Sequence, residues 1–82
     1  MSKNPGRRVV VYHAEGCHLC ERAIEVVSAV QAELGFELEL VDIGGDPALE
    51  ARFREQLPVV EIDGEPAFTY FVTPAAFRAR LL

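Results

Sequence analysis

The spacing of apolar residues changes along the chain, and each change predicts a different element. Residues 9–12 form a continuous run of β-branched and aromatic side chains, which predicts a strand buried on both faces. From about residue 18 to residue 34 the apolar residues recur at helical spacing, and Gly35 supplies a stop. The chain therefore begins with a strand that leads into a long helix.

The next segment alternates with a period of two and ends in turn residues. Apolar and charged side chains alternate over residues 36–40, which predicts a second strand that ends near Ile43. After a glycine pair, Asp46 is suited to cap a helix that begins at Pro47, where a missing N–H costs nothing. We expect this second helix to end before Pro58.

The last third of the chain repeats strand and turn signals at short spacing. Residues 59–62 predict a third strand, the Asp63-Gly64 dipeptide predicts a two-residue hairpin turn, and residues 67–71 predict a fourth strand. Thr73 followed by Pro74 repeats the combination of a cap and a helix-initiating proline. The helix that follows should carry three apolar residues on one side: Phe77, Leu81 and Leu82.

The resulting element order is β-α-β-α-β-β-α, so the predicted fold class is α/β. Helices between the first three strands imply parallel pairing among them, whereas the fourth strand returns as an antiparallel hairpin partner. We expect a four-stranded mixed sheet flanked by three helices, forming a single domain over residues 9–82 after a flexible tail of residues 1–8. A chain of 82 residues has no room for a second core.

Charge and hydropathy exclude several classes of partner. The net charge of −5 argues against a nucleic-acid-binding surface. We interpret the basic cluster Lys3, Arg7 and Arg8 as part of the solvated tail. No apolar run approaches the roughly 20 residues that span a bilayer, and no apolar leader follows the first residues. We therefore expect a cytoplasmic monomer that binds neither nucleic acid nor membranes.

Candidate chemistry is concentrated in Cys17-His18-Leu19-Cys20, which holds both cysteines of the chain. In a reducing compartment such a pair is more often catalytic or metal-binding than structural. Cys17 falls at the start of the predicted long helix, where free N–H groups and the helix dipole favour a thiolate. Cys20 lies one turn later on the same side. We expect Cys17 to be the nucleophile and Cys20 the resolving thiol of a dithiol–disulfide couple.

His18, between the two cysteines, has two interpretations. A protonated imidazole would stabilise the Cys17 thiolate and make the couple more oxidising, so His18 is a candidate for thiolate modulation. Alternatively, the ring simply faces solvent, and the charges of Glu15 and Glu21 oppose any such effect. The sequence leaves both interpretations open.

A zinc site would need ligands beyond this cysteine pair. The chain has no second Cys-x-x-Cys, and its only histidines are His13 and His18. Structural zinc sites are usually closed by four Cys or His ligands, so we assign no metal ligands.

The cysteine segment, preceded by a strand and Gly16 and followed by a helix and later by Leu57-Pro58-Val59, resembles the thioredoxin fold and, more closely, short bacterial glutaredoxin-like proteins. The resemblance covers nearly the whole chain, from about residue 9 to residue 82. It implies a small thiol–disulfide oxidoreductase that reduces protein or low-molecular-weight disulfides. It also implies that Pro58 is a cis-proline beside the dithiol and that the Leu57 backbone is a docking edge for an extended substrate. The residues expected to bind substrate are Leu57, Pro58, Val59 and Thr73.

Two features of glutathione-binding glutaredoxins are absent from the sequence. Those proteins commonly carry a Lys three residues before the first cysteine, where this chain has Ala14 followed by Glu15. They also carry a Gly-Gly pair and an acidic residue after the fourth strand, where this chain reads Val-Thr-Pro-Ala over residues 72–75. The Leu57 backbone and the amides near Thr73 could still hold a carboxylate. We expect no cofactor, although glutathione stays open as a co-substrate, and a reductant that is either glutathione or of the thioredoxin-reductase type.

Two other functions stay open at this point. One is a metal or iron–sulfur carrier in which Cys17 thiolates of two subunits bridge a cluster. The other is a non-catalytic interaction module that keeps the fold but not the chemistry.

Overall fold

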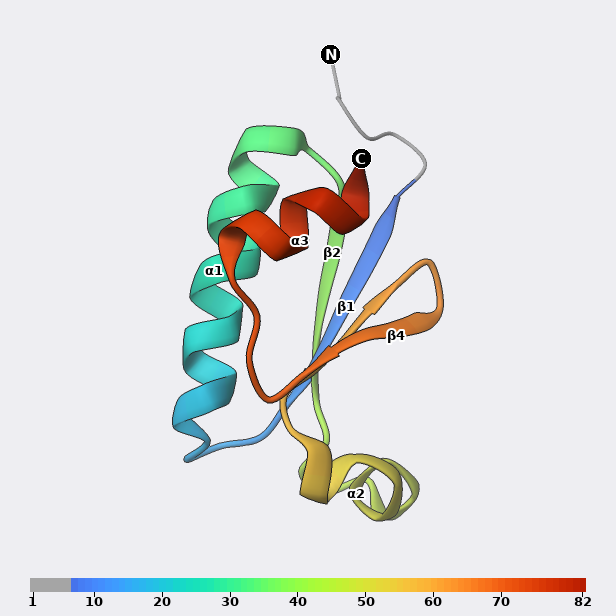
Figure 1. The fold of residues 1–82 in the computed structure, drawn as a ribbon. Helices are drawn as coiled ribbons and strands as arrows, with labels where there is room; N and C mark the ends of the chain where they lie inside the picture. The colour runs from blue at the N-terminus through green and yellow to red at the C-terminus, as the bar shows by residue number, and fades with distance from the viewer. Residues whose placement is uncertain (1–6) are drawn as a thin grey trace.

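A computed structural model describes residues 7–82, so the predicted tail falls mostly outside the described residues. The elements follow the predicted order (Figure 1). They are β1 (Arg8–His13), α1 (His18–Leu34), β2 (Glu37–Asp42), α2 (Pro47–Phe53), the 3₁₀ helix η1 (Arg54–Gln56), β3 (Val59–Ile62), β4 (Glu65–Thr69) and α3 (Pro74–Leu81). None of the helices in residues 7–82 is both long enough and apolar enough to cross a bilayer.

The four strands form a mixed sheet in the order β2-β1-β3-β4. β1 and β2 are parallel, but β3 runs antiparallel to β1, so the prediction of three parallel strands is wrong for β3. A parallel return would have to run back along β1, which has six residues and is about 20 Å long. α2 has seven residues, spans only about 10 Å, and lies beyond one end of the sheet in Figure 1. The chain therefore re-enters the sheet from that end, in the opposite direction.

Helices α1 and α3 pack against one face of the sheet and enclose the main core (Figure 1). We call this the α1–α3 core. Its buried residues are Val9, Val11, Val27, Val30, Phe36, Val60, Ile62, Phe77 and Leu81. The predicted pattern of α3 is only partly right, because Leu81 is 2% exposed whereas Leu82 is 86% exposed.

The other face of the sheet is covered only at the end where α2 lies. There Ile43, Phe53 and Val59 form a small buried group, which we call the end cluster. Tyr12 stacks on Phe53 with ring centroids 4.3 Å apart. Farther along β1, within residues 7–82, Val10 is only half-buried, although its partner Glu61 on β3 is 7% exposed. The prediction that β1 is buried on both faces therefore holds for one face only.

Local signals set the helix boundaries as predicted. Gly35 adopts a left-handed conformation with φ of 75° and ends α1, donating its N–H to the Gln31 carbonyl at 2.8 Å. The Asp46 side chain accepts hydrogen bonds from two amides of α2, and Thr73 caps α3 in the same way. A proline occupies the start of each of these two helices.

The fourth strand begins and ends two residues earlier than predicted. Asp63 and Gly64 both have positive φ values, 52° and 87°, as a tight two-residue turn requires. Pairing therefore resumes at once, with Glu65 opposite Ile62. The strand ends at Thr69 because Tyr70 has a φ of 65°, which is incompatible with an extended chain.

The interpretation of Arg7 and Arg8 as part of a solvated tail is wrong, because both residues belong to the folded domain. Arg7 forms an ion pair with Asp63 at 2.8 Å, and the Arg8 amide donates to the same carboxylate at 3.0 Å. Arg8 also begins β1 and forms an ion pair with Glu39 on β2. These contacts join the start of β1 to the β3–β4 turn.

Candidate dithiol site

The loop after β1 places Cys17 at the N-cap position of α1, directly before its first residue, His18. The Cys17 amide donates to the Ala14 carbonyl at 3.4 Å, which closes the turn. Gly16 within it has a φ of 79°, a conformation that residues with a side chain rarely adopt. A Cβ at Gly16 would meet no atom within 4 Å. The glycine is therefore needed for its backbone conformation and not for space.

Cys17 and Cys20 form a disulfide across the first turn of α1, with Cα atoms 5.2 Å apart. Cys17 is also the N-cap of the helix, and its sulfur accepts a hydrogen bond from the Cys20 amide at 3.1 Å. That amide and the dipole of a 17-residue helix both favour negative charge at this position.

The two sulfur-bearing residues differ sharply in burial. Cys20 is 1% exposed and packs on the sheet side of α1, whereas Cys17 is half-buried. Of the two cysteines, only Cys17 is therefore accessible to a molecule from solution.

Pro58 lies at the same end of the sheet as the dithiol loop. Tyr12 at the end of β1 is paired with Val59, so the preceding Pro58 lies beside the start of the Cys17 loop. The Leu57–Pro58 peptide bond is cis. Pro58 itself is buried, and its carbonyl accepts a hydrogen bond from the Tyr70 amide at 3.1 Å. The sheet thus brings the two parts of the sequence signature to one end of the molecule.

The other residues predicted to bind substrate have different surroundings. Val59 is 1% exposed and belongs to the end cluster, against which Leu57 also packs. The Thr73 hydroxyl oxygen accepts a hydrogen bond from the Ala76 amide at 3.2 Å and so caps α3. Val59 therefore offers no side-chain surface to a substrate, whereas Thr73 lines an open groove described below.

His18 extends into solvent, with 94% of its side chain exposed. Its Nδ1 atom lies 3.7 Å from a carboxylate oxygen of Glu21. No hydrogen bond among the described residues joins the imidazole to either sulfur. Any effect of His18 on the thiolate is therefore exerted through solvent.

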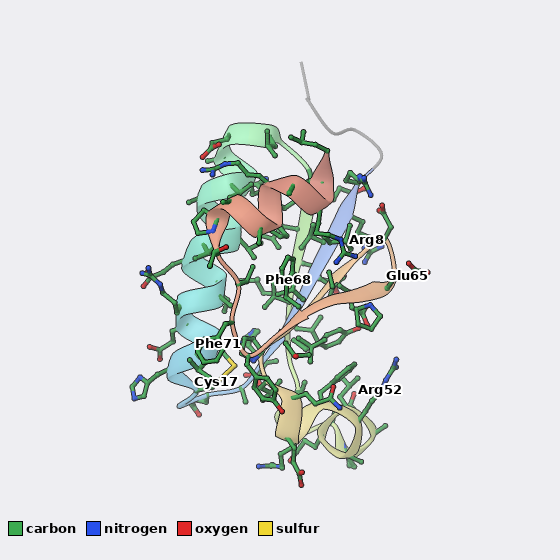
Figure 2. The ribbon with its side chains drawn as sticks, in the orientation of Figure 1. Arg8, Cys17, Arg52, Glu65, Phe68 and Phe71 are labelled. Atoms are coloured by element: carbon green, nitrogen blue, oxygen red, sulfur yellow. A yellow bond between two sulfur atoms is a disulfide. The ribbon has the colours of Figure 1, made fainter. Side chains whose placement is uncertain are left out.

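Three residues near the dithiol were not expected from the sequence. Leu19, Tyr70 and Phe71 line a groove of about 200 Å³ between α1 and the segment that joins β4 to α3. Figure 2 shows Phe71 and Cys17 at the same end of the molecule. The sequence signal was present, because two consecutive aromatic residues precede the cap of the last helix. Both residues also fit the end of the fourth strand predicted over residues 67–71.

Metal-ligating side chains do not gather at this site or elsewhere in residues 7–82. No group of three or more His, Cys, Asp or Glu residues in that range is arranged to hold an ion.

Several known proteins are similar to this chain in sequence. Residues 8–82 match the family described as Glutaredoxin-like domain (DUF836). The chain is 39% identical over 69 residues to Uncharacterized protein Rv0508 of Mycobacterium tuberculosis, and that overlap covers 78% of this chain and 71% of the relative. Uncharacterized protein Mb0520 of Mycobacterium bovis gives the same values.

Solved structures show the same arrangement of helices and strands. Protein Ne2328 from Nitrosomonas europaea is 33% identical, with a TM-score of 0.76 and coverage of 93% of this chain and 92% of that one. Protein XcR50 from X. campestris is 27% identical, also with a TM-score of 0.76, covering 89% and 93%. Fasciola hepatica thioredoxin, at 22% identity, TM-score 0.66 and coverage of 95% and 81%, shares the fold. The predicted thioredoxin fold is confirmed.

Proposed function

The chain belongs to the glutaredoxin-like domain family (DUF836), and from that premise we propose that it is a thiol–disulfide oxidoreductase that reduces disulfides of other molecules through Cys17 and Cys20. The fold and the cysteine pair at disulfide distance support a redox-type function. The specific reaction is our proposal.

The observation that carries the proposal is the unequal burial of the two cysteines. An exchange reaction through a mixed disulfide needs one sulfur that a partner can reach and a second that reaches only the first. Cys17 is half-buried at the helix start, and Cys20 is 1% exposed one turn later. A structural disulfide would not require this asymmetry.

In the first step, the Cys17 thiolate attacks one sulfur of a partner disulfide. The partner S–S bond breaks, a bond forms between Cys17 and the partner, and the departing thiolate takes a proton from water. The Cys20 amide, 3.1 Å from the Cys17 sulfur, stabilises the attacking thiolate.

In the second step, the Cys20 thiolate attacks the Cys17 sulfur and releases the partner as a second thiol. The partner has gained two electrons, and the protein has lost two electrons and carries the Cys17–Cys20 disulfide. An external thiol or dithiol reductant then returns both cysteines to the reduced state by the reverse exchange. The backbone beside Pro58 lies at this end of the sheet and is proposed to align the partner chain.

The test is trapping with single-cysteine variants. A reduced Cys20→Ser protein mixed with a disulfide-bonded protein such as insulin should accumulate a mixed disulfide at Cys17, visible by mass spectrometry and reversed by dithiothreitol. Cys17→Ser should accumulate almost none, because the remaining sulfur is buried. Equal trapping by both variants, or none by either, would contradict the proposal.

A further inference from the structure

The groove beside the dithiol has an apolar floor. The groove has a volume of about 200 Å³. Its lining includes Ala23 and Val26 of α1 and Val72 from the segment between β4 and α3. Ala23 and Val26 are 1% and 6% exposed, so the floor is closed and continuous with the core. An apolar side chain that enters the groove gains free energy by leaving water, because the floor residues are themselves already buried.

The rim of the groove also carries exposed apolar side chains. Phe71 is 73% exposed, Tyr70 44% and Leu19 38%. Single exposed apolar residues are ordinary, but three around one groove form a patch of the kind that marks a binding site. Leu19 lies between the two cysteines in sequence, and Phe71 lies at the same end of the molecule as Cys17 (Figure 2).

An unusual backbone turn holds Phe71 in this exposed position. Tyr70 has a φ of 65°, which is rare and unfavourable for a large side chain. The Phe71 amide donates to the Thr69 carbonyl at 2.7 Å across this turn. The Tyr70 hydroxyl donates to the Glu55 carbonyl at 2.7 Å, and its amide donates to Pro58. The turn is therefore fixed to the residues around the cis-proline, and Phe71 is directed away from the core.

Charges around the dithiol favour a basic partner. Glu15 and Glu21 are both exposed on either side of the cysteine pair. Arg22 lines the groove, but its guanidinium lies 3.5 Å from the carboxylate of Glu25. Glutathione carries two carboxylates and one ammonium group, and the exposed glutamates beside the cysteine pair do not complement those carboxylates. Lys or Arg side chains on a partner would complement the exposed glutamates.

We propose that this groove docks an extended protein segment with a large apolar side chain beside the attacked cysteine and a Lys or Arg nearby, and that Phe71 selects that segment. The inference rests on the proposed function and names the substrate class of the same site. The apolar side chain enters the groove between Leu19 and Phe71 while the partner sulfur faces Cys17. Glutathione disulfide, which has no comparable apolar group, gains nothing from the groove.

The test compares second-order rate constants for reduction of four disulfides by the reduced protein. Two are extended peptides of equal length, one with Leu and Lys beside its disulfide-linked cysteine and one with Ser and Glu. The others are glutathione disulfide and the small neutral hydroxyethyl disulfide. We expect the Leu–Lys peptide to react about tenfold faster than the Ser–Glu peptide, since burial of one side chain is worth about that factor.

Phe71→Ser should remove most of that preference. We expect about a tenfold loss with the Leu–Lys peptide and less than about a twofold change with hydroxyethyl disulfide. Phe71→Leu should retain most of the rate with the peptide. The matched control is Leu40→Ser, which removes an apolar side chain 45% exposed on the edge strand β2, outside the groove. It should leave all four rates unchanged.

Failure of the inference and failure of the proposed function give different results. If the protein reduces all four disulfides without preference, or prefers glutathione disulfide, the docking proposal is wrong and the oxidoreductase function stands. If no disulfide is reduced, the function is wrong. Docking is then measured with a Cys17→Ser/Cys20→Ser protein and a Leu–Lys peptide with Ser in place of Cys. Phe71-dependent NMR shifts at the groove support docking, and their absence overturns it.

Discussion

The α1–α3 core and the end cluster are built from the same kinds of side chain but differ in size. The core buries nine residues between the sheet and two helices, whereas the end cluster buries three beneath one short helix. The dithiol loop and Pro58 lie at the end of the sheet that the small cluster supports. Regions with little buried apolar surface open at lower free energy than the core. We therefore expect the dithiol to lie in a part of the protein that opens more readily than the α1–α3 core.

The largest test of this comparison is Phe77→Ala in the α1–α3 core. Phe77 is fully buried and makes edge contacts with Phe36 at 5.7 Å and Phe68 at 6.2 Å. We expect a loss of about 3–5 kcal/mol in the free energy of unfolding, from the cavity and the lost transfer energy. The measurement is urea denaturation of the reduced protein. Below the transition, the rate of disulfide exchange should stay within about twofold of the native value.

The matched control for Phe77 is Phe71→Ala, which removes the same side chain from an exposed position. Its unfolding free energy should change by less than about 0.5 kcal/mol. A similar loss in the two variants would show that stability is not concentrated in the core.

Phe53→Ala tests the end cluster in the same way. We expect a smaller loss of about 3 kcal/mol, at the low end for this substitution, because a thin cluster near the surface can relax around the gap. Phe53 packs with Val59, which follows Pro58, so the site should shift as well. The exchange rate with hydroxyethyl disulfide should fall about tenfold, as displacement of catalytic groups by a fraction of an ångström does. If the exchange rate of Phe53→Ala is unchanged, the end cluster does not position the dithiol site.

Asp63 allows a test at the opposite end of the sheet. The Arg8 amide, followed by the Arg7 guanidinium, lowers the pKa of the Asp63 carboxyl below its ordinary value of 3.8. A carboxyl whose pKa is lower in the folded state stabilises the fold above its unfolded pKa. This contribution is lost as the pH falls through the folded pKa.

Asp63→Asn should therefore lower the urea midpoint at pH 7 and leave it nearly unchanged below the folded pKa of Asp63. Exchange rates should be the same in both proteins at neutral pH, because Asp63 lies in the β3–β4 turn. A midpoint difference that persists in acid would assign the effect to a cause other than the carboxylate charge.

The smallest expected effect is that of His18→Ala. Its side chain is 94% exposed and faces Glu21, so solvent screens its influence on Cys17. We expect the exchange rate to change by less than about twofold and the reduction potential to stay almost constant. Equilibration against a glutathione buffer measures the potential. A strongly more negative potential in the variant would instead show that the imidazole stabilises the thiolate.

The sequence predictions are accurate where an element depends on residues close together in the chain, and they fail where it depends on long-range packing. α1 was predicted at its observed bounds because its apolar spacing, Cys17 at its start and Gly35 at its end are all local signals. β3 was likewise placed correctly over Val59–Ile62. The direction of β3 was wrong because it depends on where the short helix α2 packs, which is a property of the whole sheet.

The candidate site shows the same division. The spacing of Cys17 and Cys20 gave their placement on one helical turn, and the family resemblance pointed to Pro58. The difference in burial between the two cysteines could not be predicted, since it depends on how α1 packs on the sheet. Phe71 was missed because only the positive φ of Tyr70 takes it out of the strand. No sequence pattern predicts a positive φ at a tyrosine.

The burial of Cys20 has a practical consequence for handling the protein. In the reduced, folded state a maleimide reagent can reach one sulfur, so labelling should stop at a single adduct on Cys17. That adduct would fix one attachment point at the start of α1, and every immobilised molecule would present the groove in the same orientation. Although the chain contains two thiols, a reagent in solution therefore finds a single reactive position.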